Sequence, residues 1–236
     1  LGDVYKRQKE HYVIAASVET PDGAIPSRPN TYTGCSDYMP NFAAFMQYQW
    51  GNGQHVRLSG VVRGLEYRDL VEGKNYKKTG WGVHASTVFR PVAPLTVYGA
   101  VITGKGLGSL INDLQNSPMD LVGDTERPGR MLAPLNFGWY AALQYHFRPN
   151  LFSTIVFSEE RFLPKDEPVY ENVTYKYGLY GAANIFWNIT PRCQVAVEYN
   201  LGKRQNIDRS HSWVNRVSLM AVSYTHLRAH ETEADL

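Results

Sequence analysis

The stretch Asn136–Phe147, NFGWYAALQYHF, decides which fold class the sequence predicts. Successive side chains of a β-strand point to opposite faces, so every second residue shares a face. One alternate set is wholly apolar: Phe137, Trp139, Ala141, Leu143, Tyr145 and Phe147. The other set is mostly polar or small: Asn136, Gly138, Tyr140, Ala142, Gln144 and His146. This pattern predicts a strand with one apolar face and one face that tolerates water.

The same period of two recurs between residues 9 and 222. Clear alternation predicts strands over His55–Arg63, Trp81–Arg90, Tyr175–Asn188 and Cys193–Arg204, although Phe186 stands on an otherwise polar or small face. Weaker patterns predict strands near Tyr12–Thr20, Asn41–Trp50, Leu95–Thr103, Leu151–Arg161 and Trp213–Ala221. Most are close to the roughly 9–11 residues that a tilted strand needs to cross a bilayer. We therefore expect ten strands.

The connections between these strands alternate strictly between short and long. The short ones are Gly51–Gly53, Pro91–Pro94, Arg148–Asn150 and Ile189–Arg192. The long ones are Pro21–Pro40, Val71–Gly80, Gly104–Leu135, Phe162–Thr174 and Gln205–Ser212. Outer-membrane barrels have short periplasmic turns and longer external loops, whereas a soluble sandwich has no reason to keep this order. The sequence thus predicts an all-β, antiparallel, up-and-down transmembrane β-barrel.

Composition narrows the function classes. The formal net charge of the 236 residues is only +2, so no basic stripe indicates a nucleic-acid partner. No apolar run approaches the roughly 18 residues of a membrane-spanning helix. The mean hydropathy of −0.36 is compatible with a membrane barrel, because a barrel strand is apolar on one face only. Cys35 and Cys193 form neither a disulfide scaffold nor a zinc site, and we expect them at opposite rims, too far apart to bond.

The two ends of the chain differ from the rest. LGDVYKRQ (Leu1–Gln8) and SYTHLRAHETEADL (Ser223–Leu236) lack the alternation and resemble strings produced when library adapter sequence is translated at the ends of metagenomic reads. We therefore expect residues 1–8 and 223–236 to be non-native flanks of a partial barrel at 9–222. The alternative is that they are genuine polar tails.

Aromatic residues gather at both ends of the apolar faces. Amphipathic rings favour membrane–water interfaces, so these positions predict two lipid-facing girdles. The alternative is that they are edge aromatics of a sandwich core. The expected girdle residues are Trp50, Trp81, Phe89, Phe137, Trp139, Tyr145, Phe147, Tyr175, Tyr177 and Trp187.

Several phrases resemble the DcaP-type trimeric outer-membrane porins. They include IPSRPNTYTGCSDYMPNF (25–42), RLSGVVRGLEYRDLV (57–71) and the stretch from Pro128 to Phe152, and the resemblance covers nearly all of 10–221. It implies a homotrimer in the bacterial outer membrane, small negatively charged dicarboxylate solutes, and about sixteen strands per barrel. The ten strands expected here would then be the C-terminal ones. Ten strands cannot close so wide a barrel, so we expect a curled, open sheet.

The faces opposite the apolar rows are expected to line a water-filled pore. Arginine keeps its charge and presents a planar fork suited to carboxylates, so rings of arginine and lysine favour anions. The alternative is that the arginines pair with Glu198, Glu160 and loop acids and only stiffen the wall. The charged candidates are Arg57, Arg63, Arg90, Arg204, Arg216 and Lys176, with Glu198 and Glu160 as counter-charges. The neutral candidates are Tyr98, Tyr140, Tyr180, Gln144, Asn184 and Asn200.

The longest connection, Gly104–Leu135, has a length that is usually functional. We expect a helical turn within SLINDLQNSPMDL (109–121), and we expect the segment to fold over or into the pore mouth and narrow it. The alternatives are a mobile outside loop and a trimer contact. The candidate residues for this constriction are Asp113, Asp120, Asp124, Glu126, Arg127 and Arg130.

No motif indicates catalysis, a metal or a cofactor. GKGLGS (104–109) lacks the ending of a phosphate-binding loop, and His84 and His146 lie on separate strands without metal-ligand spacing. The predicted function is passive diffusion of small polar, anionic solutes. One alternative is a phospholipase-like barrel enzyme, although His84 and Ser86 share the inward face rather than the lipid face. The other is a soluble all-β carbohydrate-binding module.

Overall fold

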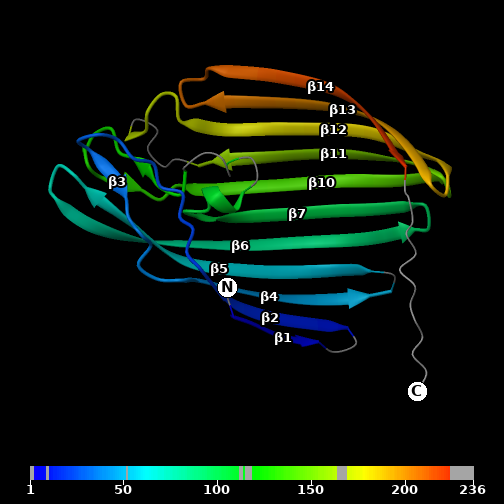
Figure 1. Ribbon diagram of the computed structural model, residues 1–236, viewed down its shortest axis with the longest axis horizontal. Helices are drawn as coiled ribbons and strands as arrows, with labels where there is room; N and C mark the ends of the chain where they lie inside the picture. Colours follow the sequence, from blue (N-terminus) through cyan, green and yellow to red (C-terminus); the bar gives the residue numbers. More distant parts are fainter. Residues whose placement is uncertain are drawn as a thin grey trace.

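The chain folds into one curved 12-stranded antiparallel sheet and a small two-stranded ribbon (Figure 1). The computed structural model describes residues 3–8, 11–51, 53–111, 114, 119–163 and 169–223. Along the main path, strands follow chain order as β1-β2-β4-β5-β6-β7-β10-β11-β12-β13-β14, and β3 pairs separately with β5. The bounds are β1 Asp3–Gln8, β2 Tyr12–Glu19, β3 Tyr32–Gly34, β4 Asn41–Trp50, β5 Gln54–Asp69, β6 Lys74–Val92, β7 Leu95–Lys105, η1 Gly108–Leu110, β8 Val122–Gly123, β9 Met131–Leu132, β10 Leu135–Arg148, β11 Leu151–Phe162, β12 Tyr175–Thr190, β13 Cys193–Asn206 and β14 His211–Ser223.

The up-and-down topology predicted from the alternation is confirmed. Each of the ten expected strands is present, and consecutive ones pair antiparallel, as in Gln144↔Thr154 and Thr154↔Asn184. The short turns lie together at one end of the sheet, at the right of Figure 1, and the long segments lie at the other. Both cysteines are free and lie at opposite ends of the sheet. The backbone N–H of Cys35 donates to the Glu66 carbonyl near the long segments, whereas Cys193 follows a short turn.

Two connections expected to be long are mostly strand. β5 and β6 continue as a hairpin to the pair Asp69↔Lys74, where the Tyr67 and Tyr76 rings stack 5.7 Å apart and Gly73 takes a positive φ of 69° at the turn. A short turn between Asn206 and His211 connects β13 to β14, and in it Asp208 accepts hydrogen bonds from the backbone N–H and the hydroxyl of Ser210. Cross-strand stacking and side-chain-to-backbone bonds in these turns therefore lengthen the strands beyond their alternating pattern.

The structure also contains a strand that we excluded from the barrel. Asp3–Gln8 pairs with β2 from Asp3↔Val18 to Gln8↔Val13. An edge strand presents unpaired N–H and C=O groups, with which any extended segment can pair. That residues 1–8 are a non-native flank stays a prediction. The expected flank at the other end begins with Ser223, the last residue of β14, and its remainder lies outside the described residues.

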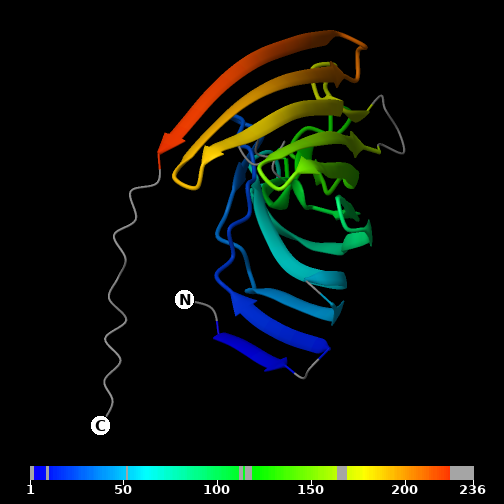
Figure 2. The ribbon, with the colours of Figure 1, turned by 90° about the vertical axis from the view of Figure 1, so that its right-hand side faces the viewer.

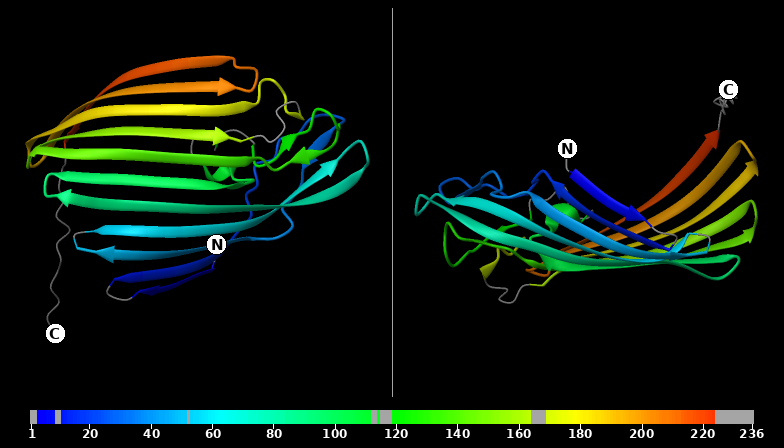
Figure 3. Two further views of the ribbon diagram at one scale, coloured as in Figure 1. Left: turned by 180° about the vertical axis from the view of Figure 1, so that it is seen from behind. Right: turned by 90° about the horizontal axis from the view of Figure 1, so that it is seen from below.

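The sheet curls into a trough that does not close, as expected for a partial barrel (Figures 2 and 3). No pairing joins β1 to β14 among the described residues. The described residues of the segment 106–134 begin on the concave side with η1, as the view from below shows (Figure 3). A Cβ added to Gly82 would lie 2.7 Å from Leu107 of this segment, so Gly82 and the residues that alternate with it face the concave side.

The convex face carries the apolar rows and is uncovered. Leu143, Ile155 and Trp187 are 51%, 60% and 49% exposed. No second layer of protein covers these rows within the described ranges, which contradicts the sandwich alternative. In the same ranges, no helix is long and apolar enough to cross a membrane.

Candidate functional site

A chain of hydrogen bonds crosses the concave face from β7 to β12. Tyr98 Oη donates to Gln144 Oε1 at 3.3 Å, and Gln144 Nε2 donates to Thr154 Oγ1 at 3.3 Å. The backbone N–H of Thr154 donates to Asn184 Oδ1 at 3.0 Å. Gln144, Thr154 and Asn184 are directly opposite one another in the register, so the pairing of the strands builds the row.

The chain continues onto β13 and ends on a carboxylate. Asn184 Nδ2 donates to Glu198 Oε2 at 3.2 Å, and Asn200 Nδ2 donates to Glu198 Oε1 at 3.0 Å. Tyr180 Oη donates to Asn200 Oδ1. We call Tyr98, Gln144, Thr154, Tyr180, Asn184, Glu198 and Asn200 the polar belt. All except Thr154 are among the residues predicted to line the pore, and Thr154 was missed because its place opposite Gln144 depends on the register of the two strands.

Four of the arginines predicted to line the pore are accessible to solvent along the concave face. Arg57 is half-buried, lies 4.1 Å from the Phe45 ring centroid and donates from Nε to Gln47 Oε1 at 2.9 Å. Arg204 is exposed and lies 5.6 Å from the Tyr175 ring. Arg216 is exposed and opposite Asn200, whereas Arg90 is exposed at the short-turn end. Tyr140 is exposed on the concave face, and Lys176 is half-buried at a bulge in β12.

Three residues predicted to line the pore are buried: Arg63, Glu160 and Asn200, of which Asn200 is 6% exposed within the polar belt. The side chain of Arg63 is fully buried, and Glu160 is 3% exposed. Glu160 packs so closely against Gly138 that a Cβ there would lie 2.3 Å from its carboxylate. Gly106, Ser109 and Asp120 contact the Arg63 guanidinium, and neither the Arg63 nor the Glu160 side chain is open to solvent. Arg63 therefore follows the alternative given in the sequence analysis, in which an arginine pairs with loop acids instead of lining the pore.

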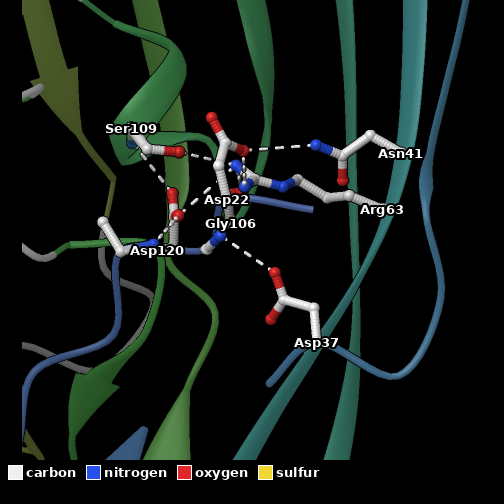
Figure 4. A network of polar contacts seen from close by, with 9 residues as sticks. Asp22, Asp37, Asn41, Arg63, Gly106, Ser109 and Asp120 are labelled. Carbon is white, nitrogen blue, oxygen red and sulfur yellow. Dashed lines mark hydrogen bonds and ion pairs between the residues drawn. The ribbon is translucent and has the colours of Figure 1, made fainter. Parts of the chain in front are cut away.

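Arg63 connects β5 to two long segments (Figure 4). Its Nη2 lies 3.0 Å from Asp22 Oδ1, and its Nη1 lies 3.3 Å from Asp120 Oδ2 and donates to Ser109 Oγ at 2.8 Å. Asp120 also accepts the N–H groups of Ala24 at 2.7 Å and Ser109 at 2.9 Å. We call Asp22, Arg63, Ser109 and Asp120 the loop clamp.

The loop clamp depends on burial and on a glycine. Burial raises the pKa of the Asp120 carboxyl, while the charge of Arg63 and the N–H donors oppose the rise. Gly80 lies opposite Arg63, and a Cβ there would lie 2.6 Å from Arg63 Cγ. The absence of a side chain at Gly80 therefore leaves room for the arginine to reach both segments.

Two apolar clusters seat the segment 106–134 on the concave face. The first joins Leu121 and Met131 to Tyr32, Leu65 and Tyr67 near β5. The second joins Leu114, Met119 and Val122 to Phe162 and Tyr175 near β11 and β12. Burying a Leu or Met side chain contributes about 1.5–3 kcal/mol, so the described residues of the segment are a packed part of the fold.

Tyr175 is the one girdle candidate that the structure places on the other face. It is 5% exposed in the second cluster and donates from Oη to the Glu160 carbonyl at 3.1 Å. The register shifts between Tyr175 and Tyr177, and this β-bulge breaks the alternation from which the girdle was predicted.

Four charged residues of the segment, Asp124, Glu126, Arg127 and Arg130, lie in a local turn. Asp124 Oδ1 accepts the N–H groups of Glu126 and Arg127, and Asp124 Oδ2 lies 3.6 Å from Arg130 Nη1. The helical turn expected in 109–121 is represented by η1, while Asp113 and residues 112 and 115–118 lie outside the described residues.

Comparison with known proteins gives a match at the level of structure. No family model and no curated protein matches the sequence. The crystal structure of the outer membrane channel DcaP of Acinetobacter baumannii matches with a TM-score of 0.79 and 19% identity, over 94% of this chain and 62% of that chain. The fold is that of DcaP. The NanC porin structure also matches, with a TM-score of 0.47 and 12% identity, over 95% of this chain and 98% of that one.

The DcaP likeness confirms the fold that the sequence resemblance implied. This chain spans 62% of that channel's length, and its sheet is open.

The other girdle candidates lie on the convex face of the DcaP-like sheet. Tyr145 and Phe147 meet edge to face at 5.1 Å, and Trp50 stacks on Tyr48 at 5.8 Å. Trp139 donates from Nε1 to Glu159 Oε2 at 3.3 Å. Their contact with lipid stays a prediction. The remaining members are Trp81, Phe89, Phe137, Tyr177 and Trp187.

The residues considered above for catalysis, metal binding or phosphate binding do not come together in one site. Among the described residues, no hydrogen bond joins His84 to Ser86, and no group of three acidic, histidine or cysteine side chains could hold a metal. His146 instead stacks on Phe152. Gly104–Ser109 carries the chain from β7 onto the concave face.

Proposed function

We propose that this chain forms part of the wall of a water-filled channel in the bacterial outer membrane, through which small polar, anionic, dicarboxylate-like solutes diffuse passively. The observation that carries the proposal is the opposition of the two faces of one layer. The convex rows are apolar and exposed, as at Ile155, whereas the concave face holds the polar belt. A wall between lipid and water needs this distribution.

The anion preference rests on the balance of accessible charge. Arg57, Arg90, Arg204 and Arg216 bring fixed positive charges to the concave wall. Glu198 already accepts two amide donors, so its charge is partly satisfied within the belt. Arginines in a confined aqueous space raise the local potential and concentrate anions. The structurally similar DcaP is an outer membrane channel, which supports transport rather than catalysis.

The segment 106–134 would narrow the mouth of this channel, because it is packed against β5 on one side and against β11 and β12 on the other. The homotrimer implied by the sequence resemblance belongs to the proposal as well.

Neutralising the arginines is expected to reverse or weaken the selectivity. We expect the triple variant Arg57→Gln, Arg204→Gln, Arg216→Gln to lower the anion-to-cation permeability ratio by about threefold or more, since each fixed charge shifts the local potential. The reversal potential across a planar bilayer with a salt gradient measures the ratio. The matched control is Lys74→Gln at the tip of the β5–β6 hairpin. A wild-type channel that prefers cations would contradict the anionic part of the proposal, and a protein that never conducts would contradict all of it.

A further inference from the structure

Three rings stand in a row on the concave face, near the short-turn end. His146 of β10 stacks on Phe152 of β11, with centroids 5.1 Å apart and planes 29° apart. Phe152 stacks on Phe186 of β12 at 5.1 Å, with planes only 3° apart. Phe186 is the apolar residue that the sequence analysis noted on the otherwise polar or small face of Tyr175–Asn188. We call His146, Phe152 and Phe186 the ring row.

The register determines how the rings stand. His146 is directly opposite Phe152, and Phe152 is directly opposite Phe186. The 5.1 Å separations are close to the spacing of about 4.8 Å between neighbouring strands, so the rings stack along the direction that crosses the strands. Their faces are therefore turned to one another, and their edges are turned away from the wall, toward the concave space.

The ring row lies directly beside the polar belt. Gln144, Thr154 and Asn184 are each two residues from a ring on the same strand and face. The wall thus offers aromatic edges and, one step along the strands, amide and hydroxyl groups. Both Phe152 and Phe186 are half-buried and keep accessible surface. The diffusion of simple polar solutes does not require apolar rings on a wall that faces water.

We propose that the ring row is a binding site for solutes that carry a planar aromatic ring, an inference that rests on the proposed channel function. The edge of an aromatic ring is positively polarised and its face negatively polarised, so a solute ring lying flat against the row makes edge-to-face contacts. Polar substituents of the solute would reach the belt. The site would thereby distinguish an aromatic ring from a saturated ring of the same size.

The test compares benzoate with cyclohexanecarboxylate, which has the same charge and nearly the same size but no π face. Each is added to the protein in a planar bilayer, and the concentration that half-blocks the chloride current is measured. Edge-to-face contact is expected to favour benzoate by about threefold or more in the wild type. The variant Phe152→Leu, Phe186→Leu should reduce this ratio to about one, because leucine keeps the apolar volume and removes the π edge.

The control is Phe89→Leu, an aromatic substitution on the convex face at the same end of the sheet, which should keep the wild-type ratio. Phe186→Leu alone should give an intermediate ratio and serves if the double variant does not fold, as judged by its mobility on gels before and after heating. A conducting channel that does not prefer benzoate, or a double variant that keeps the preference, overturns the ring-row proposal alone. A protein that gives no chloride current overturns the channel and this site together.

Discussion

Arg63→Met is expected to free the segment 106–134 from the wall. The substitution leaves Asp120 buried without its cation, and removal of one member of a buried pair costs about 3–5 kcal/mol. We expect trypsin to cleave after Arg130, which Met131 follows, at least tenfold faster, and the single-channel conductance to rise or become noisier as the segment leaves the concave face. Limited proteolysis and bilayer recordings measure the two effects.

Two further variants make this expectation specific. Arg57→Met removes a wall arginine that lies outside the loop clamp, so the cleavage rate should stay near that of the wild type. Arg63→Met combined with Asp120→Asn removes both charges and should recover part of the protection, since no unpaired charge remains. Equal cleavage rates in Arg63→Met and the wild type would show that the apolar clusters hold the segment without the clamp.

Ile155→Arg is expected to destabilise the membrane-inserted protein far more than Val156→Arg. Ile155 is exposed on the convex face and Val156 is its neighbour on the concave face of the same strand. An arginine on the lipid face near the bilayer midplane costs about 2–4 kcal/mol, whereas the same group on the wet face keeps its hydration. Urea unfolding in lipid vesicles, followed by gel mobility, measures the difference.

The comparison of these neighbours controls for strand propensity and side-chain size. Equal losses of stability at Ile155 and Val156 would mean that both faces meet the same medium, and the assignment of the convex face to lipid would be wrong.

The strand positions and the two faces could be predicted because they depend on local alternation. The apolar set beginning at Phe137 lies on the convex face, and the opposite set includes Gln144 of the polar belt. The direct pairing of Gln144, Thr154 and Asn184 needed the register, which the turns determine and the alternation does not.

The errors arose where distant segments meet the wall. The burial of Arg63 depends on Asp120, which is far away in the chain and reaches it only after the segment folds back. Tyr175 changes face because of a bulge, which leaves no mark in a period-two pattern. The extension of β5 and β6 depends on stacking between Tyr67 and Tyr76 in residues that alternate weakly.

The most direct test of the central claim is a cysteine scan along Asn136–Phe147 in a Cys35→Ser, Cys193→Ser background, with the protein in lipid vesicles. Each position is labelled with a spin probe, and its collision rates with oxygen and with a water-soluble nickel complex are compared. We expect the ratio to alternate with a period of two, with oxygen favoured at positions such as Leu143 and nickel at positions such as Gln144. A flat profile along the strand would contradict a wall with lipid on one side and water on the other.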